Sequence, residues 1–318
     1  MAQWLRGYRA ALWIGWVALC IAGISYARIR GVPGGVAAPV LAAFLIEYPF
    51  YLVAAFPSVR ERVAGARLPF FLTASIVLPY LVACGAGAFH WIALVKLIAV
   101  ALALGLWFVA LPAGAATDLG FLALLALVLL GRYFDGIYSK PFRGVDLSIL
   151  GKIAVFQMAT LALMLARRAP ETGYGFLPTR REWRIGTLHF LYFIPVGLPL
   201  ALALKAVQFP AHAPSLLIVG MFLGYLWVVA LNEEFLLRGF LQPLMEQWTS
   251  SRAAGLLLTS AVFGLVHLPF RGVPNWRWVL IAATLGWFCG RARNQAGGIR
   301  AGMVTHALTI AAWRGFFV

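Results

Sequence analysis

Apolar stretches long enough to cross a lipid bilayer follow one another along almost the whole chain. Of its 318 residues 63% are hydrophobic and only 11% are charged, whereas about 25% of the residues in soluble domains are charged. A helix needs about 20 apolar residues to span a membrane. We therefore predict an all-α, polytopic membrane protein with about eleven transmembrane helices. They are expected near residues 10–27, 36–56, 69–88, 91–111, 118–138, 149–166, 187–206, 215–235, 253–268, 277–290 and 297–317.

The longest polar interruption divides the chain into two parts. Residues 167–186 contain two pairs of adjacent arginines together with glycines and prolines, a composition typical of a loop between domains. We predict an N-terminal domain of about six transmembrane helices at residues 1–170 and a second domain of about five at residues 171–318. Nearly all the polar residues that can carry chemistry lie in the second part.

The net charge is +16, because 26 Lys and Arg outnumber 10 Asp and Glu. The basic residues are spread over many short loops, which suits the anionic inner face of a membrane better than a groove for nucleic acid. Their distribution favours a cytoplasmic N-terminus. We expect a multi-pass protein of the lipid bilayer with no nucleic-acid partner. Its richness in Ala, Leu and Gly favours a bacterial inner (plasma) membrane.

Charged residues appear at the end of the eighth apolar stretch, at Glu233, Glu234 and Arg238. Each charge at the centre of a bilayer helix costs about 2.5–3.5 kcal/mol, so such residues mark functional sites by default. On a helix Glu234 and Arg238 are four residues apart and share a face, where they can pair. Glu233 points about 100° away and is free for chemistry. The alternative is a structural ion pair at a helix end, with Glu233 reaching the headgroups.

Two histidines, His267 and His306, lie within later apolar stretches. A lone histidine on an apolar helix is usually a hydrogen-bonded core residue. Two of them beside a free carboxylate can instead exchange protons near neutral pH and activate a water molecule. Glu233, His267 and His306 also have the composition of a zinc site with two histidines and one carboxylate. The sequence contains no HExxH motif, so no compact zinc motif supports that alternative.

Three acidic residues of the first part also fall in or near predicted spans. Glu47 is expected near the middle of a span, where a carboxylate needs a partner or a water-filled cavity. Lys96 in the fourth span is a candidate partner, and a structural pair between two helices is the simplest interpretation. Asp118 and Asp135 fall at span ends, where we expect them to be solvated.

Three motifs in the second part together resemble the CPBP family of CaaX prenyl endopeptidases and bacteriocin-processing enzymes, also called Abi. They lie within about residues 214–317: Glu233-Glu234-x-x-x-Arg238, Phe263-x-x-x-His267 and His306 in a His-Ala-Leu helix. The resemblance implies a helical intramembrane protease with its site in a water-accessible cavity. It implies a membrane-anchored protein or lipidated peptide as substrate and no cofactor, with zinc as the alternative. The additional N-terminal helices resemble those of extended bacterial members that trim C-terminal protein-sorting anchors.

The resemblance also assigns roles to individual residues. Glu233 and His267 are expected to activate water, His306 to stabilise the oxyanion, and Arg238 to brace Glu234. Water activation needs the Glu233 carboxylate and the His267 imidazole about 2.6–3.2 Å apart, or joined through one water. Because the predicted span ends at residue 235, we expect the cavity to open nearer the cytoplasmic leaflet.

One position departs from the family pattern. Four residues after His306, where the family usually has an oxyanion-binding Asn, this chain has Ile310, which cannot donate a hydrogen bond. Loss of an oxyanion donor costs about 10²–10³ in rate, unless Thr305, Thr309 or Asn232 takes its place. The alternative function is therefore a non-catalytic membrane protein of the same fold, such as an immunity factor, a scaffold or a small-solute carrier.

Overall fold

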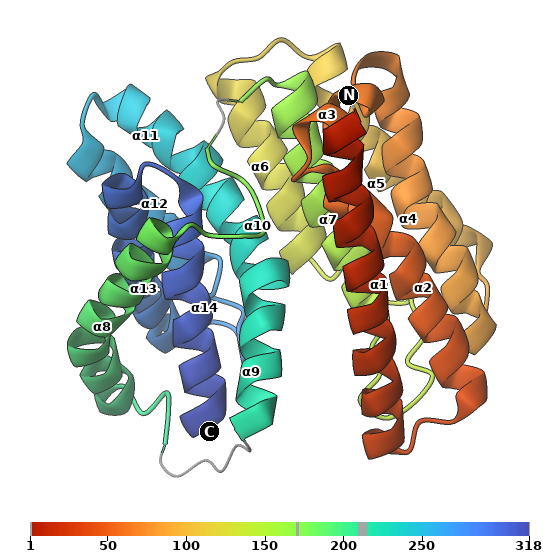
Figure 1. Cartoon of the computed structure of the whole chain (residues 1–318). Helices are drawn as coiled ribbons and strands as arrows, with labels where there is room; N and C mark the ends of the chain where they lie inside the picture. The colour runs from red at the N-terminus through yellow and green to blue at the C-terminus, as the bar shows by residue number, and fades with distance from the viewer. Residues whose placement is uncertain (1, 170–171, 209–214, 318) are drawn as a thin grey trace. The chain divides into compact units, whose positions relative to one another are not determined.

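The structure is a computed structural model that describes residues 2–169, 172–208 and 215–317 (Figure 1). Throughout these ranges the regular elements are helices, and no strand of a sheet occurs. The prediction of an all-α fold is confirmed. The chain forms two compact units, Met1–Ala169 and Pro170–Val318, which are described separately.

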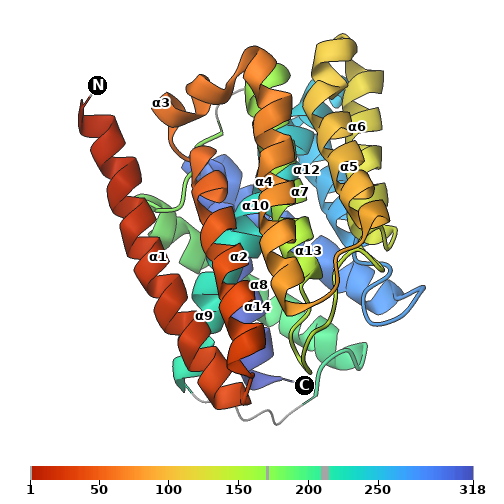
Figure 2. The same ribbon diagram turned by 90° about the vertical axis from the view of Figure 1, so that its right-hand side faces the viewer.

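In the first unit α4 packs against α2, α5 and α7, and α1 packs against α2. Figure 2 shows α1, α2 and α4 running beside one another. The helices are α1 (Ala2–Arg30), α2 (Gly34–Val53), α3 (Pro57–Arg60), α4 (Leu68–Ala83), α5 (Trp91–Ala110), α6 (Ala115–Leu130) and α7 (Ser148–Leu161), which ends in a π-helical segment (Ala162–Ala166). Short 3₁₀ turns lie at Glu61–Val63, Gly65–Arg67 and Cys84–Ala86.

In the second unit α13 packs against α8, α12 and α14, and α14 also packs against α8 and α9. The helices are α8 (Arg180–Ala203), α9 (Ser215–Gly224), α10 (Leu231–Glu234), α11 (Gln242–Thr249), α12 (Arg252–Leu265), α13 (Trp276–Ala296) and α14 (Ile299–Phe316). Two π-helical segments, Tyr225–Ala230 and Phe235–Leu241, connect α9 to α10 and α10 to α11. These three helices therefore form one continuous helical stretch.

A polar link joins the beginnings of α8 and α14. Thr179 and Glu182 form a capping box at the start of α8, where each side chain accepts a hydrogen bond from the backbone N–H of the other residue. The second carboxylate oxygen of Glu182 accepts a hydrogen bond from Arg300 at 3.0 Å. Since Arg300 lies in the first turn of α14, this ion pair fixes the position of α14 along α8.

The structure supports a multi-pass membrane protein. Seven helices among the described residues are long and apolar enough to cross a membrane, and two shorter apolar helices accompany them. The predicted count of eleven is therefore not confirmed. The seven are Arg6–Arg30, Gly34–Val53, Gly65–Ala86, Trp91–Ala110, Ser148–Ala166, Arg180–Ala203 and Ile218–Thr249; the shorter two are Ala115–Leu130 and Arg252–Leu265.

Asp118 does not behave as the sequence predicts. Its side chain is buried and accepts two hydrogen bonds from Arg167, at 2.7 and 2.9 Å, so the prediction that it is solvated is wrong. The reason is that Arg167, 49 residues away in sequence, folds onto it. Asp135 is exposed, as expected, and pairs with Arg132 at 2.7 Å.

The predicted pair between Glu47 and Lys96 does not form. Glu47 is buried within α2, and neither of its carboxylate oxygens has a hydrogen-bond partner among the described residues. Lys96 is exposed on α5 and makes no ion pair in the same part of the chain. The two residues are therefore separate features of the first unit.

Candidate active site

The helix that carries the two adjacent glutamates continues well beyond the span predicted from the sequence. Residues Ile218–Thr249 form one helical stretch of 32 residues, with Glu233 and Glu234 at its middle. The predicted span stopped at residue 235, because π-helical continuation through Phe235–Leu241 cannot be recognised in the sequence. The expectation that the cavity opens nearer the cytoplasmic leaflet therefore loses its basis. Single π-helical segments occur frequently at functional sites.

Glu234 and Arg238 form a fully buried ion pair. The Arg238 Nη1 donates to Glu234 Oε1 at 3.1 Å, and both side chains have no exposed surface. The Nη2 donates to the carbonyl oxygen of Gly286 on α13 at 3.0 Å. The guanidinium carbon also lies 4.5 Å from the centre of the Phe263 ring on α12, a cation–π distance. One arginine thus contacts the two helices that pack beside its own.

His306 contacts both glutamates from α14. Its Nδ1 lies 3.0 Å from Glu234 Oε1, and its Nε2 lies 3.8 Å from Glu233 Oε2. A carboxylate paired with arginine can only accept, so Nδ1 carries the proton and donates to Glu234. The Nε2 is then the nitrogen that faces Glu233. The Glu233 side chain is 25% exposed, whereas that of His306 is 2% exposed, so the carboxylate of Glu233 is the accessible one of the two.

His267 lies in the turn that follows α12. Its Nδ1 is 2.8 Å from the carbonyl oxygen of Phe263; because a carbonyl only accepts, this nitrogen carries the proton and Nε2 is free to act as a base. The Phe263 ring lies edge-on to both histidine rings, 4.8 Å from that of His267 and 5.3 Å from that of His306. Glu233 and His267 form no direct ion pair in the described part of the chain.

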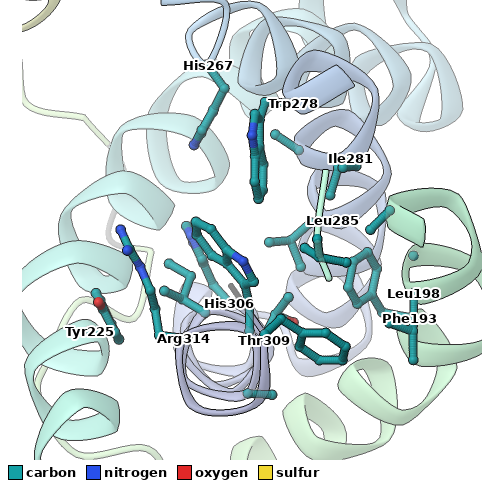
Figure 3. Close-up of a pocket in the computed structure, with 18 of the residues that line it drawn as sticks. Phe193, Leu198, Tyr225, His267, Trp278, Ile281, Leu285, His306, Thr309 and Arg314 are labelled. Atoms are coloured by element: carbon teal, nitrogen blue, oxygen red, sulfur yellow. The ribbon is translucent and has the colours of Figure 1, made fainter. Parts of the chain in front are cut away.

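One pocket brings these groups together (Figure 3). It has a volume of about 420 Å³ and is lined by Glu233, His267 and His306, together with many apolar side chains from α8, α13 and α14. A single water molecule occupies about 30 Å³ in the liquid, so the pocket has room for water and for a substrate segment. Three of the five predicted site residues thus line one cavity although they lie far apart in the sequence, whereas Glu234 and Arg238 are buried outside its lining.

Of the three candidate replacements for the missing Asn, Thr309 is the one that lines the pocket, next to Ile310. Its hydroxyl donates to the carbonyl oxygen of Thr305 at 2.9 Å, a bond that rotation about χ1 can exchange for another acceptor. Thr305 is fully buried and donates to Gly186 instead. Asn232 is also fully buried, and its side-chain nitrogen donates to a backbone carbonyl one turn earlier.

The residues around the ion pair do not fit a zinc ion. Glu233, His267 and His306, the zinc ligands considered from the sequence, line one pocket, but as a set they are not among the groups of close ligand atoms in the described residues. Within residues 2–169, 172–208 and 215–317, the one group of three such ligands is Glu234, Cys289 and His306, whose ligand atoms lie within 4.8 Å of one another. A cation there would lie beside the guanidinium of Arg238, which already donates to Glu234. We therefore derive no reaction step through a metal.

Sequence reasoning missed the glycines that allow this packing. A Cβ on Gly302 would lie 2.7 Å from Glu234 Oε2, and a Cβ on Gly286 would lie 3.0 Å from Arg238 Nη2. Real Cβ atoms essentially never come as close as the contact at Gly302, and the contact at Gly286 is tighter than most. The lack of a side chain at both positions therefore lets α13 and α14 pack closely against the ion pair. The signal in the sequence is a glycine inside an apolar helix, which often marks close packing.

The fold and the site define a class, a polytopic helical membrane protein with a buried Glu–Arg–His cluster beside an apolar pocket. Residues 213–311 match the family model described as type II CAAX prenyl endopeptidase Rce1-like. The matched segment is about a third of the chain and contains all five predicted site residues. The resemblance to the CPBP family is therefore confirmed over this segment. No curated protein and no solved structure matches the chain.

Replacement of Arg238 by Leu is expected to destabilise the protein by about 3–5 kcal/mol, because it leaves the Glu234 carboxylate buried without its partner. The double variant Arg238→Leu, Glu234→Leu should lose less stability than Arg238→Leu alone, since no buried charge is left. Thermal unfolding of the purified protein in detergent measures both. A double variant less stable than Arg238→Leu would contradict this account of the pair.

Proposed function

We propose that this chain is an intramembrane endopeptidase that hydrolyses peptide bonds of membrane-anchored protein substrates. The observation that carries the proposal is the convergence of Glu233, His267 and His306 on one pocket. The match to an endopeptidase family over residues 213–311 supports the same conclusion. A structural ion pair alone needs Glu234 and Arg238 and gives no reason for an accessible carboxylate and a free imidazole nitrogen beside them.

In the proposed reaction Glu233 and His267 activate a water molecule held between them. The carboxylate of Glu233 and Nε2 of His267 both accept, so together they orient the water and remove one of its protons. The water oxygen forms a bond to the carbonyl carbon of the substrate. When the C–N bond breaks, the proton returns to the leaving nitrogen, which departs as an amine. Atoms and charge balance without any other reactant.

The oxyanion of the tetrahedral intermediate needs hydrogen-bond donors that point at its oxygen, away from the groups that activate the water. His306 is held by Glu234 through Nδ1, so its Nε2 is the atom that faces the pocket and donates when the ring is protonated. Thr309, one turn further along α14, is the proposed second donor in place of the missing Asn. A water-excluding apolar site makes such donors more effective than they are in water.

The lining of the pocket favours a hydrophobic substrate. Apart from the polar groups named above, most of its walls are aliphatic and aromatic side chains from α8, α13 and α14. A transmembrane anchor or a lipid-modified peptide would bury its apolar surface there. We therefore propose a membrane-anchored or lipidated, including prenylated, polypeptide as the substrate class. The proposed place of action is a bacterial inner membrane.

A second candidate function is a non-catalytic membrane protein that binds such a peptide without cleaving it. The observation that favours it is Ile310, which lines the pocket at the position where the family usually has a donor. Binding to an apolar pocket does not need the negative charge of Glu233. The two functions therefore differ in how they respond to removal of that charge.

The near-isosteric change Glu233→Gln is expected to lower kcat/KM by about 10²–10⁴, the usual contribution of a general base. The assay follows cleavage of membrane-anchored peptides by purified protein in liposomes, with products identified by mass spectrometry. Glu61→Gln is the matched control. It removes the same negative charge from a side chain that is exposed in the first unit. Equal cleavage by wild type and Glu233→Gln would contradict the proposed base.

The role of Thr309 is tested by removing its hydroxyl. Thr309→Val should slow cleavage by about 10²–10³, the cost of losing one oxyanion donor, while Ile310→Asn should raise the rate. Thr284→Val is the control, because Thr284 makes the same hydrogen bond to the carbonyl four residues earlier but lies outside the pocket lining. If Thr309→Val and Thr284→Val have the same rate, Thr309 is not the donor.

We further propose that catalysis needs no metal. Chelators such as EDTA and 1,10-phenanthroline should then leave the rate of peptide cleavage unchanged, and metal analysis of the active protein should give far less than one zinc per chain. The opposite result is one zinc per chain that is lost when His267→Ala and His306→Ala are combined. That outcome would replace the glutamate mechanism by a metalloprotease mechanism.

A further inference from the structure

Two arginines lie over a cluster of three aromatic rings that lines the same pocket. Phe270, Trp278 and Trp313, here called the aromatic platform, pack with ring centres 4.5–5.9 Å apart. The guanidinium carbon of Arg271 lies 5.4–5.9 Å from all three rings, and that of Arg314 lies 4.6 Å from the Trp313 ring. Both charges are thus held against the pocket wall at cation–π distances.

Among the residues that the structure describes, neither arginine is paired with an acidic side chain. The sequence contains no Asp or Glu after Glu246. In the described part of the second unit, Glu182, Glu234 and Glu246 already pair with other arginines, which leaves Glu233 at the proposed reaction centre. Arg271 and Arg314 form no ion pair among the residues that the structure describes. Arg314 lines the pocket, and Arg271 lies over the same aromatic platform outside the lining. Both side chains are exposed, so their N–H donors are accessible to an anion.

We infer that Arg271, Arg314 and the aromatic platform form a subsite that binds a carboxylate of the substrate. This inference rests on the proposed function, because the anionic groups of an unmodified polypeptide are its carboxylates. Arginine presents a planar fork of N–H donors that matches a carboxylate in two parallel hydrogen bonds. The rings of the platform hold each guanidinium at a cation–π distance, so little side-chain freedom is lost when the anion binds. The carboxylate comes from an acidic side chain or from the end of the substrate chain.

The position of the subsite sets how far the carboxylate lies from the bond that is cleaved. His306 and Arg314 lie on the same helix, eight residues apart, which corresponds to about 12 Å along its axis. An extended peptide advances about 3.3–3.6 Å per residue. A carboxylate held by Arg314 therefore belongs to a residue about three or four positions from a bond held at His306.

Binding of three dye-labelled apolar octapeptides tests the subsite without requiring cleavage. The first has a free C-terminal carboxylate, the second a C-terminal amide, and the third an amide together with one internal Glu. Their affinities for Glu233→Gln protein in neutral detergent are measured by fluorescence anisotropy. The free acid or the Glu peptide should bind about tenfold or more tightly than the neutral one, as expected for a charge-assisted hydrogen bond. Which of the two does so identifies the source of the carboxylate.

Substitutions in the same background assign the preference to the arginines. Arg314→Gln or Arg271→Gln should reduce the tenfold preference to within about twofold, while Arg314→Lys retains part of it. Arg252→Gln is the control and should keep the full preference, because Arg252 is exposed at the start of α12 and outside the pocket. Elution as a single species in gel filtration establishes that each variant is folded.

The outcomes separate this subsite from the proposed function. If wild type cleaves no peptide but the preference for a carboxylate peptide is lost in Arg314→Gln, the subsite is supported and the proposed peptidase function is wrong. If peptides are cleaved but all three bind alike, the subsite is wrong and the peptidase stands. Equal displacement of the three peptides by phosphatidylglycerol, with no preference among them, would assign the arginines to lipid phosphate and overturn the inference.

Discussion

The second unit depends on one buried group, the carboxylate of Glu234. Burying an ion in an apolar interior costs several kcal/mol unless it is paired and hydrogen-bonded. One of its oxygens accepts from Arg238 at 3.1 Å and from His306 at 3.0 Å. Because Arg238 also donates to Gly286, the cost of the charge is offset only when α10, α13 and α14 meet in one arrangement. A shift of any of these helices would leave a charge unpaired.

That constraint also orients the groups proposed for chemistry. Glu234 fixes Nδ1 of His306, so the other ring nitrogen faces Glu233. Glu233 pairs with no arginine among the described residues, and its carboxylate is accessible at the pocket. The adjacent glutamates therefore have different tasks, one in packing and one at the cavity, because successive helical residues point about 100° apart.

What could be predicted from the sequence is what depends on local spacing. The pair of Glu234 with Arg238 follows from residues four apart on a helix, and the helical class follows from long apolar stretches. Contacts between distant segments could not be predicted in this way. Asp118 is expected to be solvated because it falls at a span end, and its pairing with Arg167, 49 residues away, has no local signal in the sequence. The mid-helix position of the glutamates was missed because π-helical continuation leaves no pattern in the sequence.

The apolar surroundings that make buried charges costly also make the pocket suited to polar chemistry. Few competing water molecules and a low dielectric constant strengthen each interaction between a fixed donor and a developing charge. The same surroundings make a buried charge without a partner costly. Glu234 and Arg238 satisfy each other inside the protein, whereas Arg271 and Arg314 are exposed and form no ion pair within the described part of the chain. The guanidinium groups of Arg271 and Arg314 are therefore available to pair with the substrate carboxylate inferred above.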